Sequence, residues 1–157
     1  MTPHIRTARA DDTPVIAQFN ALMALETEQR TLDRETLRKG VETVIREASN
    51  GTYYVAEMDD SVVGHLLITY EWSDWRNGVF WWIQSVYVRE EFRGHGIFKA
   101  LYRHVEGLAR KQIGICGLRL YVEHDNQSAI RTYRKLGMKK TPYELYEIDF
   151  VLGEDPR

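Results

Sequence analysis

Two glycines separated by one residue give the chain its clearest chemical signal. The segment Arg93-Gly94-His95-Gly96 lies between a run of strand-forming residues and a helical pattern. Glycine lacks a Cβ atom, so the main chain can approach a ligand closely there, and the free N–H groups at the start of the following helix attract phosphate. The segment therefore predicts an anion-binding loop, with a purely structural turn between strand and helix as the alternative.

Two well-known phosphate loops do not fit this segment. A P-loop needs Gly-x-x-x-x-Gly-Lys-Ser/Thr, whereas Gly94 and Gly96 are too close together and no Lys-Ser/Thr pair follows them. A dinucleotide fingerprint needs a third glycine, and this chain has Lys99 at that position. The spacing thus argues against both of these nucleotide-binding classes.

Hydrophobic periodicity predicts the elements that position the loop. Residues Val79 to Val88 are rich in β-branched and aromatic side chains and predict a long central strand. Residues Ile97 to Lys111 predict a helix with one apolar side, and Gly117 to Glu123 predicts another strand. A strand, a helix and a strand in this order form a crossover unit, so the two strands should be parallel neighbours.

The rest of the chain supplies the flanking elements. Helices are expected after Thr13-Pro14 and after Asp33, and a hairpin turn at Met58 to Ser61. The other expected segments are strands at His4 to Ala8, Tyr53 to Glu57, Val62 to Tyr70 and Tyr146 to Leu152, a turn at Glu71 to Gly78, a helix at Asn126 to Leu136, and an extra strand at Met138 to Lys140. The predicted fold class is α/β, with a mixed central sheet and flanking helices.

Two segments carry a family resemblance. Val86 to Ile97, which reads Val-Tyr-Val-Arg-Glu-Glu-Phe-Arg-Gly-His-Gly-Ile, resembles the acyl-CoA pyrophosphate loop of the GNAT (GCN5-related) N-acetyltransferases. Asn126 to Met138, with its Asn, Ala, Tyr and Gly in order, resembles the second CoA segment of that family. The element order also agrees with the acyl-CoA N-acyltransferase fold over nearly the whole chain. The chain departs from the family pattern at Glu91, where Gln or Arg is usual, and at Phe98, where a small residue is common.

The resemblance implies acetyl-CoA as a co-substrate and gives roles to several residues. The N–H of Val88 would polarise the thioester carbonyl, and Tyr133 would act as the general acid for the departing thiolate. Asn126 would contact the CoA arm from about two helical turns before Tyr133. The alternatives are a plain helix cap for Asn126 and a core aromatic for Tyr133. The residues implied to bind CoA are Val86, Tyr87, Val88, Arg93, Gly94, His95, Gly96, Ile97, Phe98, Asn126 and Tyr133.

The general base and the acceptor site remain open between alternatives. Candidates for the base are Glu71, Glu26, and a water held by Gln84 or Ser85. Glu71 and Trp72 belong to a segment that combines carboxylates with indole rings, which suits a cationic amine through charge pairing and cation–π contact. A solvated turn explains the same segment equally well. We therefore expect catalysis from Glu71 together with Tyr133, and acceptor binding from Glu26, Glu71, Trp72 and Ser85.

Length and composition exclude several classes of protein. A chain of 157 residues suits one domain over residues 1–157. Its 21 Lys and Arg against 23 Asp and Glu argue against a general nucleic-acid binder, and no run approaches the roughly 18 apolar residues of a membrane span. The single cysteine, Cys116, excludes an intramolecular disulfide and is expected to be a buried thiol. The five histidines lack paired metal-ligand spacing, so no metal is expected.

Taken together, these features predict a cytoplasmic N-acetyltransferase in which a primary amine attacks acetyl-CoA directly in a ternary complex. The acceptor is expected to be a small-molecule amine, with a protein amine as the second choice. Neither a nucleic acid nor a membrane is expected as a partner, while exposed Trp and Tyr residues would suit a homodimer. The alternative function is a non-catalytic acyl-CoA-binding domain of the same fold.

Overall fold

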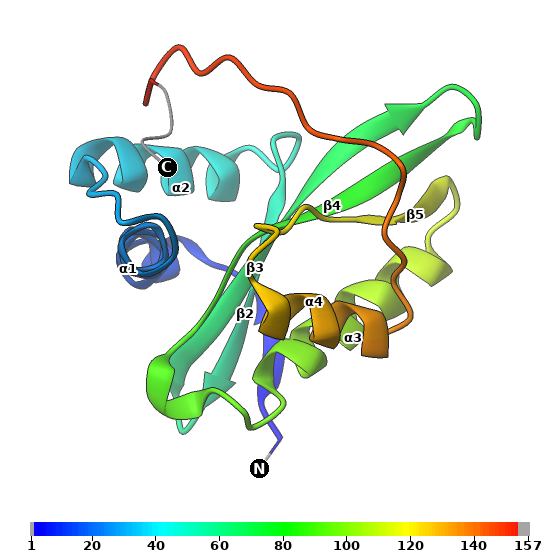
Figure 1. The fold of residues 1–157 in the computed structure, drawn as a ribbon. Helices are drawn as coiled ribbons and strands as arrows, with labels where there is room; N and C mark the ends of the chain where they lie inside the picture. Colours follow the sequence, from blue (N-terminus) through cyan, green and yellow to red (C-terminus); the bar gives the residue numbers. More distant parts are fainter. Residues whose placement is uncertain (1, 154–157) are drawn as a thin grey trace. The chain divides into compact units, whose positions relative to one another are not determined.

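The computed structural model describes residues 2–153, which group into two compact units. The first unit ends at Leu120 and the second begins at Tyr121. The prediction of a single domain over residues 1–157 stays a prediction. The sheet and the long helices belong to the first unit (Figure 1).

The first unit contains a mixed five-stranded sheet among its described residues. Its strands are β1 (His4–Thr7), β2 (Thr52–Met58), β3 (Ser61–Ser73), β4 (Gly78–Val88) and β5 (Ile115–Arg119). Its helices are α1 (Thr13–Glu28), α2 (Arg34–Arg46) and α3 (Ile97–Lys111), with short 3₁₀ turns at Ala10–Asp12 and Glu90–Phe92. The spatial order is β1-β2-β3-β4-β5, and only the β4–β5 pair is parallel. The predicted fold class and the predicted crossover unit are therefore confirmed.

Helices cover both faces of the sheet in the first unit (Figure 1). On one face, here called the α1 face, Ile16 of α1 and Val41 of α2 pack against side chains that include Val55 and Leu67. The opposite face, the α3 face, carries α3, whose His104 ring lies 5.5 Å from the ring of Tyr54. Because successive strand residues point to opposite faces, the register assigns every strand side chain to one face or the other.

The β2–β3 hairpin is as predicted, but β3 continues further than expected. Asp59 and Asp60 both have positive φ, 50° and 60°, as a two-residue primed turn requires. At the far end, Glu71, Trp72 and Ser73 still pair with β4, which begins at Gly78, so the expected turn over Glu71 to Gly78 is wrong for these four residues. Aromatic and β-branched cross-strand pairs such as Trp72 with Val79 explain why the ladder extends.

Strand β5 is shorter than predicted and Cys116 is less buried. It ends at Arg119, whereas the sequence predicted a strand from Gly117 to Glu123. Cys116 lies on β5 and is only partly buried, so the expectation of a buried thiol is not met in full. A glycine at position 117, which weakens a strand, is consistent with the shortness of β5.

The second unit contains α4 (Gln127–Lys135), close to the predicted helix. The strands expected at Met138 to Lys140 and at Tyr146 to Leu152 are wrong, because neither segment has regular structure. In the second segment a local turn competes with a strand: Oδ1 of Asp149 accepts hydrogen bonds from the N–H groups of Val151 and Leu152, each at 2.8 Å.

Candidate functional site

The loop before α3 has the geometry of an anion-binding turn. Gly94 and Gly96 both adopt φ of +79°, a left-handed conformation that favours glycine. A Cβ atom at either position would have no heavy atom within 4 Å, so the space beside the loop is open. Among the described residues, no main-chain or side-chain acceptor takes the N–H of Gly94, His95 or Gly96. This open main-chain turn at a helix N-terminus fits a diphosphate.

Val88, the last residue of β4, presents its main-chain polar groups to the side away from β3. The N–H of Arg89 donates to the carbonyl of Val63 at 2.8 Å, so Gly64 and Val88 form a pair that exchanges no hydrogen bonds. On its other side, β4 pairs with β5 only as far as Trp82 and Arg119. We call the point beyond this last pair the fork. Within the first unit, the N–H of Val88 therefore faces the open edge of β4 beyond the fork.

A bulge lies between the fork and Val88. Ser85 has a φ of 49°, and the register between β3 and β4 shifts opposite it. The Tyr53 hydroxyl interacts with the side chains of Ser85 and Asn20, whose Nδ2 donates to it at 3.2 Å. The Ser85 side chain, predicted to lie near the acceptor, is thus turned toward the α1 face.

Arg93 ties the loop to both β4 and α1. Its Nε donates to the Val88 carbonyl at 2.8 Å, and its Nη2 donates to Oε2 of Glu26 at 2.8 Å. The Tyr87 hydroxyl donates to the other oxygen of Glu26 at 3.2 Å. Burial and the Glu26 charge raise the pKa of Tyr87, which keeps this donor protonated. The Arg93 side chain thereby links Val88 to Glu26, which in turn binds Tyr87. For Arg93 the sequence analysis had predicted main-chain contacts alone.

Glu71 is paired with a residue that the sequence analysis missed. Nη1 of Arg119 donates to Oε1 of Glu71 at 2.6 Å. Trp72, the neighbour of Glu71 on β3, points to the α3 face and is 63% exposed. The structure therefore brings Glu71 to Arg119 and not to Trp72. An arginine within an apolar strand pattern was the available signal for this partner.

His65 on β3 is a buried polar residue without a role in the predicted mechanism. Its ring is fully buried, stacks on Phe19 at 5.6 Å and meets the edge of Tyr53. Neither ring nitrogen has a hydrogen-bond partner among the described residues. Burial lowers the pKa of His65 to about 3, so the imidazole stays neutral in the folded protein.

The remaining predicted site residues, Asn126 and Tyr133, belong to the second unit. Asn126 caps α4, because its side-chain oxygen accepts from the N–H of Ala129 at 3.2 Å. Tyr133 is half-buried, and burial raises the pKa of its phenol, which favours the protonated form that a general acid needs. Their contacts with CoA stay predictions.

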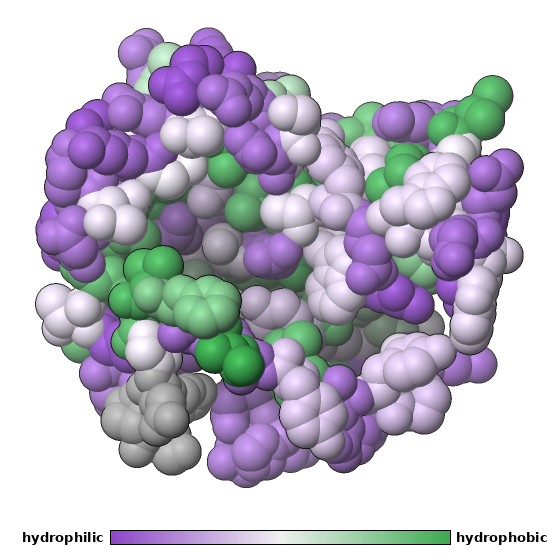
Figure 2. All heavy atoms as spheres, turned by 90° about the horizontal axis from the view of Figure 1, so that it is seen from above, coloured by the Kyte–Doolittle hydropathy of each residue, from purple (hydrophilic) through white to green (hydrophobic). Residues whose placement is uncertain are grey.

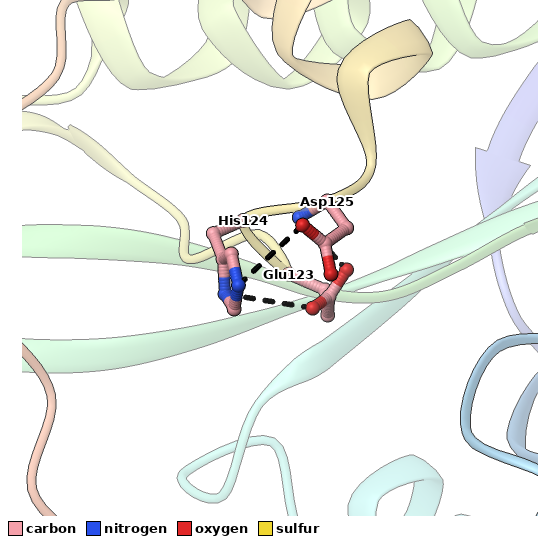
Figure 3. A group of neighbouring side chains, drawn as sticks. All are labelled: Glu123, His124 and Asp125. Atoms are coloured by element: carbon pink, nitrogen blue, oxygen red, sulfur yellow. Dashed lines mark hydrogen bonds and ion pairs between the residues drawn. The ribbon is translucent and has the colours of Figure 1, made fainter. Parts of the chain in front are cut away.

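One group of potential metal ligands lies in the described residues of the second unit. Glu123, His124 and Asp125 are consecutive, and His124 faces a carboxylate on either side at 3.5 Å (Figure 3). All three are exposed, and exposed acidic groups often gather in this way without a metal. The arrangement by itself therefore does not indicate a metal centre.

The surface is mostly polar on the face drawn in Figure 2, where hydrophobic residues form smaller groups. In the first unit, Trp75 in the β3–β4 turn is 83% exposed. Within residues 2–153, no helix combines the length and the apolar composition that crossing a bilayer requires.

Comparison with known proteins assigns the family. Residues 19–138 match the sequence profile described as the Acetyltransferase (GNAT) family. A possible acetyltransferase from Clostridium difficile 630 is 44% identical, with 96% of this chain and 99% of that chain covered and a TM-score of 0.88. No curated protein matches this chain.

Two more distant structures share the fold. A ribosomal-protein-alanine N-acetyltransferase from Brucella melitensis biovar Abortus 2308 is 17% identical, with a TM-score of 0.74 over 94% of this chain and 99% of that chain. An aminoglycoside acetyltransferase from an uncultured soil metagenomic sample, solved with sisomicin, is 17% identical, with a TM-score of 0.72 over 93% and 95% of the two chains. The profile match over most of the chain decides the question: the chain belongs to the GNAT acetyltransferase family.

Proposed function

We propose that this protein is an acetyl-CoA-dependent N-acetyltransferase that acetylates a primary amine by direct attack in a ternary complex. The observation that carries the proposal is the open loop of main-chain donors from Gly94 to Gly96 beside the open β4 edge at Val88. We place the enzyme in the cytoplasm, acting on a small-molecule amine, without a nucleic-acid, membrane or metal partner. The exposed Trp72 and Trp75 are compatible with a homodimer.

The loop and the β4 edge would bind different parts of the co-substrate. The N–H groups of Gly94, His95 and Gly96 would hold the diphosphate, because they are donors without a hydrogen-bond partner among the described residues and lie at the N-terminus of α3. The N–H of Val88 would donate to the thioester oxygen, where negative charge develops during attack. Acetyl-CoA supplies the thioester whose C–S bond breaks as the new C–N bond forms.

The two candidate carboxylates differ in how many of their oxygens already accept a hydrogen bond. Glu26 uses both oxygens, one for Arg93 and one for Tyr87. Glu71 uses one oxygen for Arg119, and its other oxygen has no partner among the described residues. Glu71 is therefore the better candidate to receive the proton of the amine, through intervening water molecules, since its strand partner Phe80 lies eight residues before Val88. Tyr133 would return a proton to the departing thiolate.

The acceptor class is the finest level of the proposal. Distant structural relatives include an enzyme named for a protein alanine and one solved with an aminoglycoside. At 17% identity these relatives share the fold alone, so neither substrate transfers to this chain. A small primary amine stays the proposed acceptor, with a protein amine as the second choice.

The test is release of free thiol from acetyl-CoA in the presence of a panel of amines. We expect release with at least one amine, and a fall in kcat of about 100-fold in Tyr133→Phe, the lower end for the loss of a general acid. The matched control is Tyr143→Phe, which removes an exposed hydroxyl from the same unit and should leave kcat unchanged. Calorimetry should give the same CoA affinity for the parent and Tyr143→Phe.

Two results would contradict this proposal. Unchanged kcat in Tyr133→Phe would remove Tyr133 from the chemistry. Binding of CoA without thiol release on any amine would instead favour the alternative, a non-catalytic acyl-CoA-binding domain. The ion pairing of both candidate bases with arginines is the observation that keeps this alternative in view.

A further inference from the structure

The bulge at Ser85 decides which main-chain groups of β4 reach the open edge. The N–H of Val79 donates to the Gly114 carbonyl at 2.7 Å, so Val79 turns its polar main-chain groups toward the β5 side of β4. Along a regular strand these groups alternate between the two sides. Val88 comes an odd number of residues after Val79, so in a regular strand its N–H would face β3.

One extra residue in β4 reverses this alternation. The register between β3 and β4 shifts between His65 and Leu67, where β4 has one residue more than β3. Beyond the bulge the N–H of Val88 faces the open edge, where the thioester is proposed to bind. The direction of the proposed oxyanion donor therefore depends on the conformation of Ser85.

That conformation is strained. The φ of Ser85, 49°, lies in the left-handed region, which costs free energy for a serine and little for a glycine. A residue keeps such a conformation only where the surrounding structure holds it there. The bulge therefore needs partners that fix Ser85.

Tyr53 and Asn20 contact the bulge from the α1 face. Both side chains are buried, with exposed fractions of 5% for Tyr53 and 7% for Asn20. The Tyr53 hydroxyl accepts from Nδ2 of Asn20 at 3.2 Å and interacts with the Ser85 side chain. A phenol that accepts one hydrogen bond still has its own hydrogen to donate, and burial raises the pKa of Tyr53, so the hydroxyl keeps this hydrogen. The hydroxyl thus joins α1, β2 and β4 at the bulge.

We propose that Tyr53 and Asn20 are positioning residues, which fix Ser85 at positive φ and thereby direct the N–H of Val88 at the thioester oxygen. This inference rests on the proposed function and gives a part in it to two residues outside the predicted site. Donors that stabilise an oxyanion act through a direction fixed before the reaction begins. Loss of the Tyr53 hydroxyl should therefore weaken polarisation of the thioester while the glycine loop still binds the co-substrate.

The experiment observes the carbonyl of bound [1-¹³C]acetyl-CoA by isotope-edited infrared spectroscopy, without an amine, so that no turnover occurs. A hydrogen bond to the carbonyl oxygen lowers its stretching frequency relative to free acetyl-CoA. We expect Tyr53→Phe to lose about half of this lowering or more, with a change in acetyl-CoA affinity of less than about threefold. The matched control is Tyr54→Phe, which removes a hydroxyl from the next β2 residue, on the α3 face, and should keep the full lowering.

A rescue variant separates positioning from a general loss of stability. Glycine adopts positive φ without strain, so Tyr53→Phe combined with Ser85→Gly should regain the lowering although the hydroxyl is still absent. With an amine that releases thiol from the parent, Tyr53→Phe should reduce kcat about tenfold at nearly unchanged KM, less than the roughly 100-fold for loss of an oxyanion donor. Circular dichroism melting checks that all variants fold.

Three results would overturn the inference: an unshifted carbonyl in the parent, an unchanged carbonyl frequency in Tyr53→Phe, or a loss that Ser85→Gly does not restore. The Val88 amide signal of the ligand-free protein, observed by ¹⁵N–¹H NMR, gives a readout that does not depend on catalysis. It should move in Tyr53→Phe and return toward the parent position in the double variant. This pattern together with the infrared result supports the inference even if no amine releases thiol, a result that would refute the proposed function alone.

Discussion

The loop before α3 differs in its composition from the cluster of Phe80 with Arg76 and Arg119, which we call the arginine platform. The loop offers main-chain N–H groups from consecutive residues, held open by two glycines at φ of +79°. The platform consists of side chains from β4, β5 and the β3–β4 turn, brought together only by sheet register. A main-chain site can therefore be predicted from the local spacing of residues such as glycine. A side-chain site assembled across strands has no such local pattern in the sequence.

This difference predicts that variants of the loop and of the platform separate into two classes. Changes in the loop should weaken binding of CoA whatever the acceptor. Changes on the platform should alter the free energy of unfolding and leave CoA affinity unaltered.

The largest effect is expected from Gly94→Val. A β-branched residue is strained at φ of +79°, so the loop must change conformation and its donors must turn away. We expect CoA affinity to fall by about 100-fold, equivalent to about 2.7 kcal/mol, as measured by calorimetry. Gly107→Ala, in the middle of α3 with open space around it, is the control and should bind CoA normally. Normal binding by Gly94→Val would show that the loop geometry is dispensable.

The next effect concerns the platform and should appear as a loss of stability. Gly117→Ala places a Cβ atom 2.6 Å from the Phe80 ring, so the ring must move. We expect a loss of about 1–3 kcal/mol in the free energy of unfolding, the usual cost of overpacking, measured by urea denaturation. The stability lost should return in the double variant with Phe80→Leu. If the single variant were as stable as the parent, the ring would not be confined by Gly117.

The core between the two regions gives a third, pH-dependent effect through His65. The folded protein holds this imidazole neutral, with a pKa of about 3 against an ordinary 6.5. Above pH 6.5 neither state is protonated, so stability is unaffected. As the pH falls below 6.5 the unfolded chain binds a proton at His65 and the folded protein does not. The free energy of unfolding therefore falls by up to about 1.4 kcal/mol per pH unit.

The measurement is urea denaturation of the parent and of His65→Leu from pH 6.5 down to about 4.5. The leucine variant does not titrate at position 65, so its stability should fall less steeply than that of the parent. Parallel pH profiles for the two proteins would mean that the imidazole is not held neutral.

The smallest effect is expected from Glu26→Gln. The ion pair between Glu26 and Arg93 is partly exposed, with side chains 39% and 43% accessible, and such pairs contribute about 0.2–1 kcal/mol. We therefore expect CoA affinity to change by less than about fivefold, and the difference to shrink at high salt because exposed charges are screened. A double-mutant cycle with Arg93→Gln isolates the pair. A coupling far above 1 kcal/mol would move Arg93 from a supporting contact to a main determinant of the loop.

The sequence predicted those parts of the fold that local patterns determine. The crossover from β4 through α3 to β5 follows from periodicity, and the helix bounds at Ile97 and Lys111 agree with the structure. Glu71 was misplaced in a turn because its segment is polar, whereas pairing with Phe80 keeps it in β3. Tertiary pairing overrode local composition at this position.

The candidate site divides in the same way. The glycine loop could be predicted because its requirement, φ above zero at fixed spacing, belongs to the residue types themselves. The partners of Arg93 and Arg119 could not, since Glu26 is 67 residues from Arg93 and Glu71 is 48 from Arg119. Such contacts follow from strand register and helix placement, which no local window contains.

The most direct test of the account is an ¹⁵N–¹H NMR titration with CoA, observed at the glycine amides. Gly94 and Gly96 should shift strongly, because their N–H groups are the proposed diphosphate donors. Gly107, in the middle of α3, should stay in place. Unmoved Gly94 and Gly96 signals at saturating CoA would contradict the central claim that this main-chain loop holds the acyl carrier.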